Sequence, residues 1–419
     1  MRVQLLPDRG GPVTDSGRYR ILDSLRGIAL LGICLANFPE FALYTFQKKE
    51  VTDAMSTAGI DHVIKYLQYI FIDGKFYTMF SVLFGTGFSI IMSRAMQKGG
   101  AGMAVFYRRM AVLALVGLLH LMFLWSGDIL LLYALLGMLL PLFRNVSDKK
   151  LLTVSVLLIL FPIVTDTVTV VAGGRFDPSA PVIRATQYFN RRNGITDDNF
   201  GVWLLNGKSY ADVFKFLVSG AFIRMQEFIE GNRVFKVLGL FLLGLYIGRN
   251  RIYANLESRK TLLKKVCVYG FAAGLPASVL YAWNSLNAQP LGLIGHSVAY
   301  AAGVVPLSLA YMSAISLLSV GANRCGRLFA ALAAPGRMAL TNYIGQSVSG
   351  IIIFYGLGFG LGATTGLAYV EMIAAGVFAM QVLCSCAWLR YMQFGPLEWI
   401  WRMFTYGKRL GIRKINIKG

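Results

Sequence analysis

Long apolar runs recur along this chain from residue 27 to residue 389, and they constrain its fold more than any other feature. About 20 apolar residues make a helix that crosses the hydrocarbon core of a bilayer. The runs leave no stretch of soluble-domain size, about 100 to 150 residues, between them. Only 15% of the residues are charged, against about 25% in soluble domains. The chain is therefore predicted to be an integral membrane protein, and an all-soluble enzyme is excluded.

Ten segments are long enough, or nearly so, to span a membrane, which predicts an all-α polytopic bundle of about ten transmembrane helices. The predicted spans are residues 27–46, 76–93, 108–125, 128–144, 151–172, 234–249, 266–283, 298–320, 338–361 and 364–389. The fourth and sixth are short. Only Ser126 and Gly127 separate the third span from the fourth, which predicts a tight antiparallel hairpin.

Positive charge orients the predicted bundle. Most of the 41 Lys and Arg residues fall on one side if the N-terminus is inside, and short cytoplasmic loops collect such residues. Both termini are therefore predicted to be cytoplasmic. The net charge of +21 is then a topology signal that also meets anionic lipid at the cytoplasmic face, rather than a sign of nucleic-acid binding.

Five regions are predicted along the chain. They are a cytoplasmic segment 1–20, a first membrane half 21–172, an external loop 173–233, a second membrane half 234–389 and a basic cytoplasmic tail 390–419. Residues 210–229 of the loop mix apolar and charged positions in the pattern of an interfacial amphipathic helix. Residues 62–72 and the aromatic stretch after the tenth span are expected at the interface for the same reason.

Polar residues at membrane depth cost free energy, so they are candidates for function. Asn37 and Glu40 flank Pro39 in the first span, and the proline removes a backbone donor and kinks a helix. The kink with two polar groups predicts the wall of a site. The alternative is an interhelical hydrogen bond and an interfacial carboxylate.

His120 and Asp128 lie on either side of the predicted hairpin turn, eight residues apart. The turn brings them close together near the outer face, where a carboxylate beside an imidazole would orient a general base. The alternative is a histidine bonded to a carbonyl, with Asp128 capping the next helix.

The remaining candidates are weaker. Asn342 and Gln346 share a helix face, and Glu371 lies two turns into the tenth span. Asn342 and Gln346 could line a cavity or simply hydrogen-bond a neighbouring helix, whereas the alternative for Glu371 is snorkelling or helix capping. The glycine-rich run at residues 355–362 favours close packing or a helix end over a dinucleotide fingerprint. The five cysteines show no disulfide framework and no metal-site spacing, so no metal is expected.

Four stretches together resemble one family. RILDSLRGIALLGICLANF, KFYTMFSVLFGTGFSI, GLLHLMFLWSGDILLLYALLG, and GRMALTNYIGQS with FGPLEWIWR resemble the YeiB-like bacterial membrane proteins, whose domain has no known function. This resemblance covers nearly the whole chain. It implies a multi-pass protein of the bacterial inner (cytoplasmic) membrane.

The opening DSLRGIA is more distantly similar to the membrane acyltransferases that O-acylate sugars, and to the lysosomal N-acetyltransferase of heparan glucosamine. In the sugar O-acyltransferases a catalytic His follows the Arg after ten residues, whereas Asn37 stands at that position after Arg26. The similarity implies acyl-CoA as a co-substrate, with no tightly bound cofactor. Arg26 would help to hold the donor, His120 with Asp128 would deprotonate the acceptor, and Asn37 would bond the developing oxyanion.

Two other classes of function remain open. Asn342, Gln346, Glu371 and the His/Asp pair could form a proton-coupled path of a small-solute transporter. A non-catalytic membrane component would bind a partner through the external loop, and an oligomer is possible. The enzyme would need an envelope glycan or lipid as acceptor.

Overall fold

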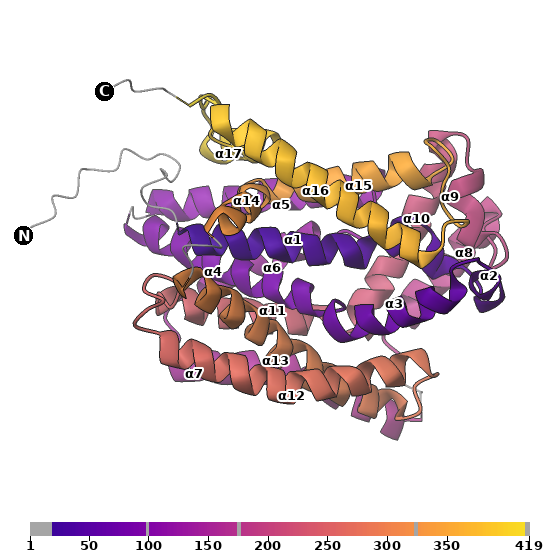
Figure 1. The fold of residues 1–419 in the computed structure, drawn as a ribbon, viewed down its shortest axis with the longest axis horizontal. Coiled ribbons are helices and arrows are strands. Elements are labelled where there is room, and N and C mark those ends of the chain that lie inside the picture. Colours follow the sequence, from indigo (N-terminus) through magenta and orange to yellow (C-terminus); the bar gives the residue numbers. More distant parts are fainter. Residues whose placement is uncertain (1–18, 98–99, 174–176, 322–325, 415–419) are drawn as a thin grey trace, which may run out of the picture.

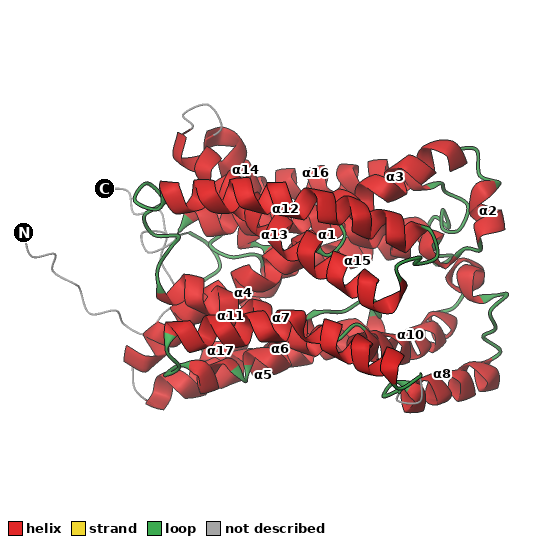
Figure 2. Cartoon of the chain, turned by 90° about the horizontal axis from the view of Figure 1, so that it is seen from below, coloured by secondary structure: helices red, strands yellow, loops and turns green. Residues whose placement is uncertain are grey.

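Helices build all regular structure in the described part of the chain. The computed structural model describes residues 19–97, 100–173, 177–321 and 326–414. Within them the long helices run along one axis, with α17 at one end of the bundle and α2 and α8 at the other (Figures 1 and 2). The predicted segment 1–20 lies almost wholly outside the described residues.

The α-helices are α1 (Arg20–Phe41), α2 (Lys49–Asp53), α3 (Ala58–Phe71), α4 (Lys75–Gln97), α5 (Gly100–Phe123), α6 (Leu130–Gly137), α7 (Asp148–Val171), α8 (Ala180–Asn193), α9 (Trp203–Asn206), α10 (Tyr210–Glu230), α11 (Arg233–Arg249), α12 (Lys260–Leu286), α13 (Gly292–Gly321), α14 (Gly326–Arg337), α15 (Ala339–Phe354), α16 (Leu367–Tyr391) and α17 (Pro396–Tyr406). Short 3-10 turns are η2 (Tyr44–Phe46), η3 (Leu140–Phe143) and η4 (Phe200–Val202).

Seven helical segments of the described chain are long and apolar enough to cross a membrane. They are Arg20–Phe41, Ala58–Ser93, Gly102–Phe123, Asp148–Val171, Lys260–Leu286, Gly292–Val320 and Leu367–Tyr391. The prediction of a multi-pass helical membrane protein is confirmed. All ten predicted spans contain a helix, but α6, α11 and α15 have only 8, 17 and 16 residues, so the number of spans supported by length and composition is smaller than ten.

Some predicted boundaries are wrong. The span predicted at 338–361 ends at Phe354, because the glycine-rich run folds back and the Gly362 N–H donates to the Phe354 carbonyl at 2.9 Å. That run is thus a helix end, as one of the two sequence interpretations had it. Residues 62–72, expected as an interfacial segment, belong to α3, which leads into α4 across the short break at 72–74.

A second break separates α10 from α11 at residues 231–232. The helix predicted at 210–229 is present as α10, and its Val213, Phe216 and Leu217 are buried in the main apolar core. Each break holds a residue with positive φ, Gly74 at 73° and Asn232 at 49°.

Glycines let helices from the two sequence halves pack closely. A Cβ at Gly85 or Gly244 would collide with a backbone carbonyl across the α4–α11 interface, and one at Gly27 would collide with Leu332 of α14. Small residues are what bring helices together in lipid, where apolar surface alone does not select a partner. The halves at 21–172 and 234–389 are therefore interleaved in space.

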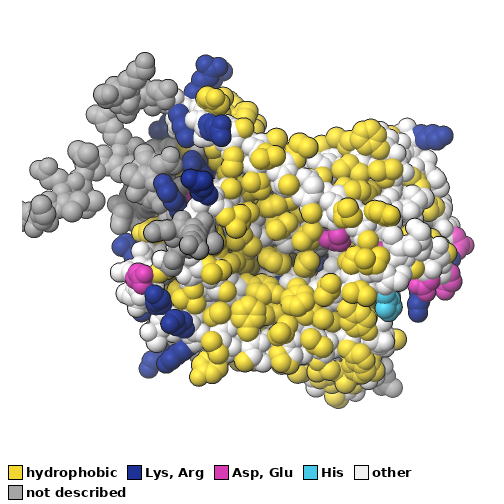
Figure 3. All heavy atoms as spheres, in the orientation of Figure 1, with side chains coloured by type: hydrophobic (Ala, Val, Ile, Leu, Met, Phe, Trp, Pro, Cys, Tyr) yellow, Lys and Arg dark blue, Asp and Glu magenta, His cyan; other side chains and the backbone are white. Residues whose placement is uncertain are grey.

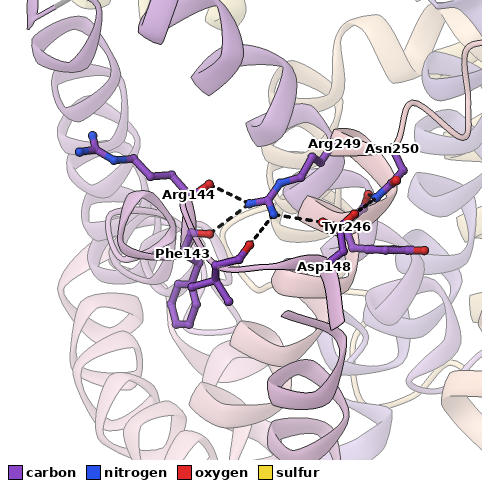
Figure 4. Close-up of polar contacts among 7 residues, drawn as sticks. Phe143, Arg144, Asp148, Tyr246, Arg249 and Asn250 are labelled. Carbon is purple, nitrogen blue, oxygen red and sulfur yellow. Dashed lines mark hydrogen bonds and ion pairs between the residues drawn. The ribbon is translucent and has the colours of Figure 1, made fainter. Parts of the chain in front are cut away.

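Arg249 fixes the end of α11 against the turn before α7 (Figure 4). Its guanidinium donates to the carbonyls of Phe143, Arg144 and Val146 at 2.6 to 3.1 Å and pairs with Asp148 at 3.1 Å. This cation bonds carbonyls of the turn that precedes α7. It anchors the short helices α6 and α11 at one end of the bundle.

The visible face of the molecule divides into three zones. Figure 3 shows an apolar belt around the middle of the visible face, with Lys and Arg gathered at the α17 end and acidic side chains at the other. We call the end where Lys and Arg gather the basic end, and the end with the acidic side chains the distal end. An apolar belt between charged ends is the surface expected of a bilayer-spanning bundle.

Candidate functional site

A cavity of ≈ 740 Å³ runs inside the bundle and touches most of its central helices. Near the basic end it is lined by four arginines, the arginine cluster: Arg26, Arg109, Arg337 and Arg402. Farther along it is lined by charges of both signs, the mixed cluster: Asp73, Arg224, Glu227, Glu230, Arg233 and Lys236. Asn37 and Glu40 also line it. One continuous space thus joins two groups of charges inside the apolar bundle.

Arg109 is the best-defined member of the arginine cluster. Its guanidinium lies 4.3 Å from the centre of the Trp401 ring, whose indole N–H donates to the Arg109 carbonyl at 3.0 Å. The Nε of Arg109 is buried and has no hydrogen-bond partner among the described residues. A buried donor without a partner costs about 1–3 kcal/mol. Such a donor beside other guanidinium groups is suited to an anionic ligand.

Glu398 places α17 over this end of the cavity. Its carboxylate accepts from the Leu340 N–H at 2.7 Å and from the Thr341 N–H and hydroxyl at 3.1 and 2.6 Å. Burial raises the pKa of Glu398, and the bonds from Thr341 act in the opposite direction. Because Glu398 caps the start of α15, α17 with Trp401 is held against the bundle.

The mixed cluster lies where the break between α3 and α4 and the break between α10 and α11 border the cavity. Glu227 pairs with Arg224 at 2.6 Å and with Arg233 at 3.4 Å, and Asp73 accepts from the Tyr281 hydroxyl. Lys236 has no carboxylate within ion-pair distance among the described residues, and its ammonium lies 4.6 Å from the Tyr300 ring. A cation without an ion-pair partner inside a membrane bundle is a candidate for a functional site.

Three predicted site residues come together at the cavity. Arg26, Asn37 and Glu40 all line it from α1, and Arg26 donates to Asp23 at 3.0 Å. Asn37 and Glu40 are three residues apart, so they share one face of the helix. The segment around Pro39 therefore lines an internal space.

The other predicted substrate-binding residues lie elsewhere. Asn342 donates to Ser385 at 3.0 Å and Gln346 to Gln381 at 3.1 Å, which joins α15 to α16. Glu371 accepts from Gln68 at 2.6 Å between α16 and α3. None of the three lines the cavity. In the described structure all three bond helix to helix, which is the alternative stated for Asn342 and Gln346 but not for Glu371.

His120 and Asp128 contact each other, as the hairpin turn predicts. The Nδ1 of His120 lies 2.9 Å from one Asp128 oxygen, and the other oxygen accepts from the Leu131 N–H at 2.8 Å, so Asp128 also caps α6. The Nε2 of His120 lies 2.9 Å from the Ser347 hydroxyl. We call these three residues the His120 cluster.

The His120 cluster is sealed behind the cavity wall. The side chains of His120 and Asp128 are each 1% exposed, and no member lines the cavity. Tyr343 lies between, since it lines the cavity and its ring centre is 5.2 Å from that of His120. A molecule in the cavity meets Tyr343 before it meets His120.

Sequence reasoning missed most of the charged lining. Arg109, Arg337 and Arg402 were counted only as topology signals, because their positions near helix ends suit cytoplasmic loops. Lys236 was the exception that could have been found, since it is a lone cation within an apolar run.

A helical bundle with seven candidate spans and a charged internal cavity defines a multi-pass helical membrane protein. Comparison with known proteins gives its family. The chain is 31% identical to the uncharacterized protein YxaH of Bacillus subtilis (strain 168), over 94% of this chain and 96% of that protein. It therefore belongs to the family of uncharacterized YxaH and YeiB proteins.

Two further matches support this membership. The uncharacterized protein YeiB of Escherichia coli (strain K12) is 27% identical over 92% of this chain and 95% of its own. Residues 247–408 match the family described as protein of unknown function (DUF418). No solved structure gives a significant match.

Proposed function

We propose that this protein is a transmembrane acyltransferase. Acyl-CoA binds at the arginine cluster, and the acyl group passes along the cavity to an acceptor that arrives from the distal end. The observation that carries the proposal is the single cavity of ≈ 740 Å³ that joins the arginine cluster to Asn37 and the mixed cluster.

The arginine cluster suits the phosphates of coenzyme A. Guanidinium groups bind phosphate through paired N–H bonds, and Arg109 brings a buried Nε with no partner in the described structure. The basic end is assigned to the cytoplasm by its Lys and Arg excess, which places the cluster on the side where acyl-CoA is made. The membrane is accordingly the bacterial inner membrane, and the acceptor is an envelope glycan or lipid.

The transfer step needs an oxyanion donor and a base. The Asn37 amide lines the cavity and would donate to the thioester oxygen as the acceptor attacks. The C–S bond then breaks, CoA leaves as the thiolate, and the proton of the acceptor hydroxyl passes to the base.

Two groups compete for the role of base. Glu40 lines the cavity beside Asn37, so it can touch the acceptor directly. His120 is oriented by Asp128 but reaches the cavity only if Tyr343 turns away. We place Glu40 closest to the acceptor and assign His120 and Asp128 a positioning role behind the wall.

The test is acyl transfer by isolated membranes supplied with radiolabelled acetyl-CoA and a longer acyl-CoA. The wild-type protein should move label into an envelope glycan or lipid. Arg109→Ala should raise the KM for acyl-CoA and Asn37→Ala should lower kcat, whereas the exposed Arg259→Ala should match wild type. Absence of label in any acceptor from wild-type membranes would overturn the proposal.

One observation favours transport as a second candidate. The breaks between α3 and α4 and between α10 and α11 both border the cavity, and Lys236, which has no ion-pair partner among the described residues, lies in the first turn of α11. Discontinuous helices around a charged site are the arrangement by which many transporters bind solutes. Solute uptake by cells that collapses with an uncoupler and with Lys236→Met would support it.

A further inference from the structure

A second cavity of ≈ 350 Å³, the side pocket, lies between α7, α11 and α13. Part of its wall is apolar, with Ile159, Ile163, Leu240, Leu293, Ala301 and Val305, and polar side chains that include Asp166, His296 and Ser297 line the rest. It meets the main cavity at Tyr77, Glu230, Gly231, Lys236, Tyr281 and Tyr300, which line both spaces. A partly apolar chamber therefore opens off the charged path at one defined junction.

Two hydrogen-bond donors lack a polar partner at this junction. Within the described part of the chain, the Lys236 ammonium makes no hydrogen bond or ion pair and lies 4.6 Å from the Tyr300 ring, and the Tyr77 hydroxyl is buried with no hydrogen-bond partner. Unmet donors of this kind favour a ligand oxygen.

The carboxylates around the junction are already engaged. Asp73 accepts from Tyr281 at 2.6 Å, Glu230 accepts from Ser179 at 2.7 Å, and Asp166 in the side pocket accepts from Ser297. Lys236 is therefore the cation at this junction that remains for a ligand.

We infer that the side pocket holds the hydrocarbon chain of a single-chain amphiphile whose carbonyl or carboxylate oxygen meets Lys236 and Tyr77. The inference rests on the proposed function and deepens it, because the chain is then that of the acyl donor. A donor lying along the main cavity would place its thioester at the junction, where Lys236 and Tyr77 would join the Asn37 amide as donors to the thioester oxygen, and its chain in the side pocket. The preferred acyl group is longer than acetyl.

Chain length should then control affinity. Each methylene moved from water into an apolar site contributes about fourfold in affinity. Binding should strengthen with each added methylene until the pocket is filled, and then level off.

Photocrosslinking tests the pocket without any need for turnover. The purified full chain in phosphatidylcholine nanodiscs is labelled with a diazirine analogue of dodecanoic acid, and the adducts are mapped. Ile163 lines the pocket, whereas its neighbour Val164 is 56% exposed on the outer face of α7. Labelling should concentrate on Ile163 and compete with free dodecanoate but not with acetate.

Matched variants distinguish photolabelling inside the pocket from photolabelling on the lipid-facing surface. Ala301→Phe fills the pocket and should abolish the competed labelling, whereas Ala302→Phe, on the exposed face of α13, should leave it intact. Lys236→Met should reduce it at least tenfold, while Lys264→Met on the surface should not. Adducts spread over Val164, or unchanged in Ala301→Phe, would overturn the inference.

The two proposals fail separately. Pocket labelling together with no acyl transfer from any acyl-CoA overturns the enzyme and upholds the pocket. Acyl transfer that Ala301→Phe leaves unchanged for both acetyl-CoA and dodecanoyl-CoA upholds the enzyme and overturns the pocket.

Discussion

The His120 cluster should hold the protein together more than it serves the reaction, and His120→Ala tests this. In the wild-type protein, one Asp128 oxygen and the Ser347 hydroxyl each lie 2.9 Å from a nitrogen of the His120 ring. The substitution leaves both of these buried polar groups without their partner. An unsatisfied buried group costs about 1–3 kcal/mol, and the space left by the ring adds to that cost. The free energy of unfolding should fall by roughly 2–6 kcal/mol.

Ser347→Ala provides the comparison. It leaves only the Nε2 of His120 unpaired, so its cost should be about 1–3 kcal/mol. Because the two residues share one bond, the double variant should lose less than the sum of the single losses, by about 0.5–3 kcal/mol. Ser349→Ala on the same helix, outside the His120 cluster, is the control and should melt with wild type.

Thermal unfolding in detergent measures these losses. Cys34 is fully buried, so the reaction of its thiol with a maleimide dye, after surface thiols are blocked, reports unfolding. His120→Ala should lower the melting temperature by several degrees. A variant that melts with wild type but has lost acyl transfer would refute this reasoning and make His120 the catalytic base.

Two other substitutions test the fold. Gly244→Leu places a side chain against the backbone of α4 and should abolish folded protein. Gly376→Leu is the control, because nothing lies within 4 Å of an added Cβ there, and it should be recovered at wild-type yield. Equal yields of the two variants would contradict the glycine-packed α4–α11 interface. Asp61→Ala removes the carboxylate that accepts from the backbone N–H groups of Leu367 and Ala368 at 3.0 and 2.8 Å. The free energy of unfolding should fall by about 1–2 kcal/mol, and the same dye assay measures it. An unchanged melting temperature would mean that water replaces this cap.

Local patterns determined much of this protein. Apolar runs of membrane-crossing length predicted where helices form, because every backbone group in lipid must be satisfied within the chain. The contact of His120 with Asp128 follows from a two-residue turn, and the shared face of Asn37 and Glu40 follows from helical periodicity. Each of these depends on residues within about two helical turns.

Tertiary structure alone decided where the site lies. Ser347 reaches His120 across 227 residues of sequence, and Arg26, Arg109 and Arg402 gather from three helices. In lipid an apolar helix face does not select a particular partner helix, since the lipid tails are equally apolar. Contacts are chosen by small residues such as Gly85 and Gly244, whose fit depends on two surfaces at once. The sequence therefore determined the helices and the membrane class, while packing decided which polar side chains share a cavity.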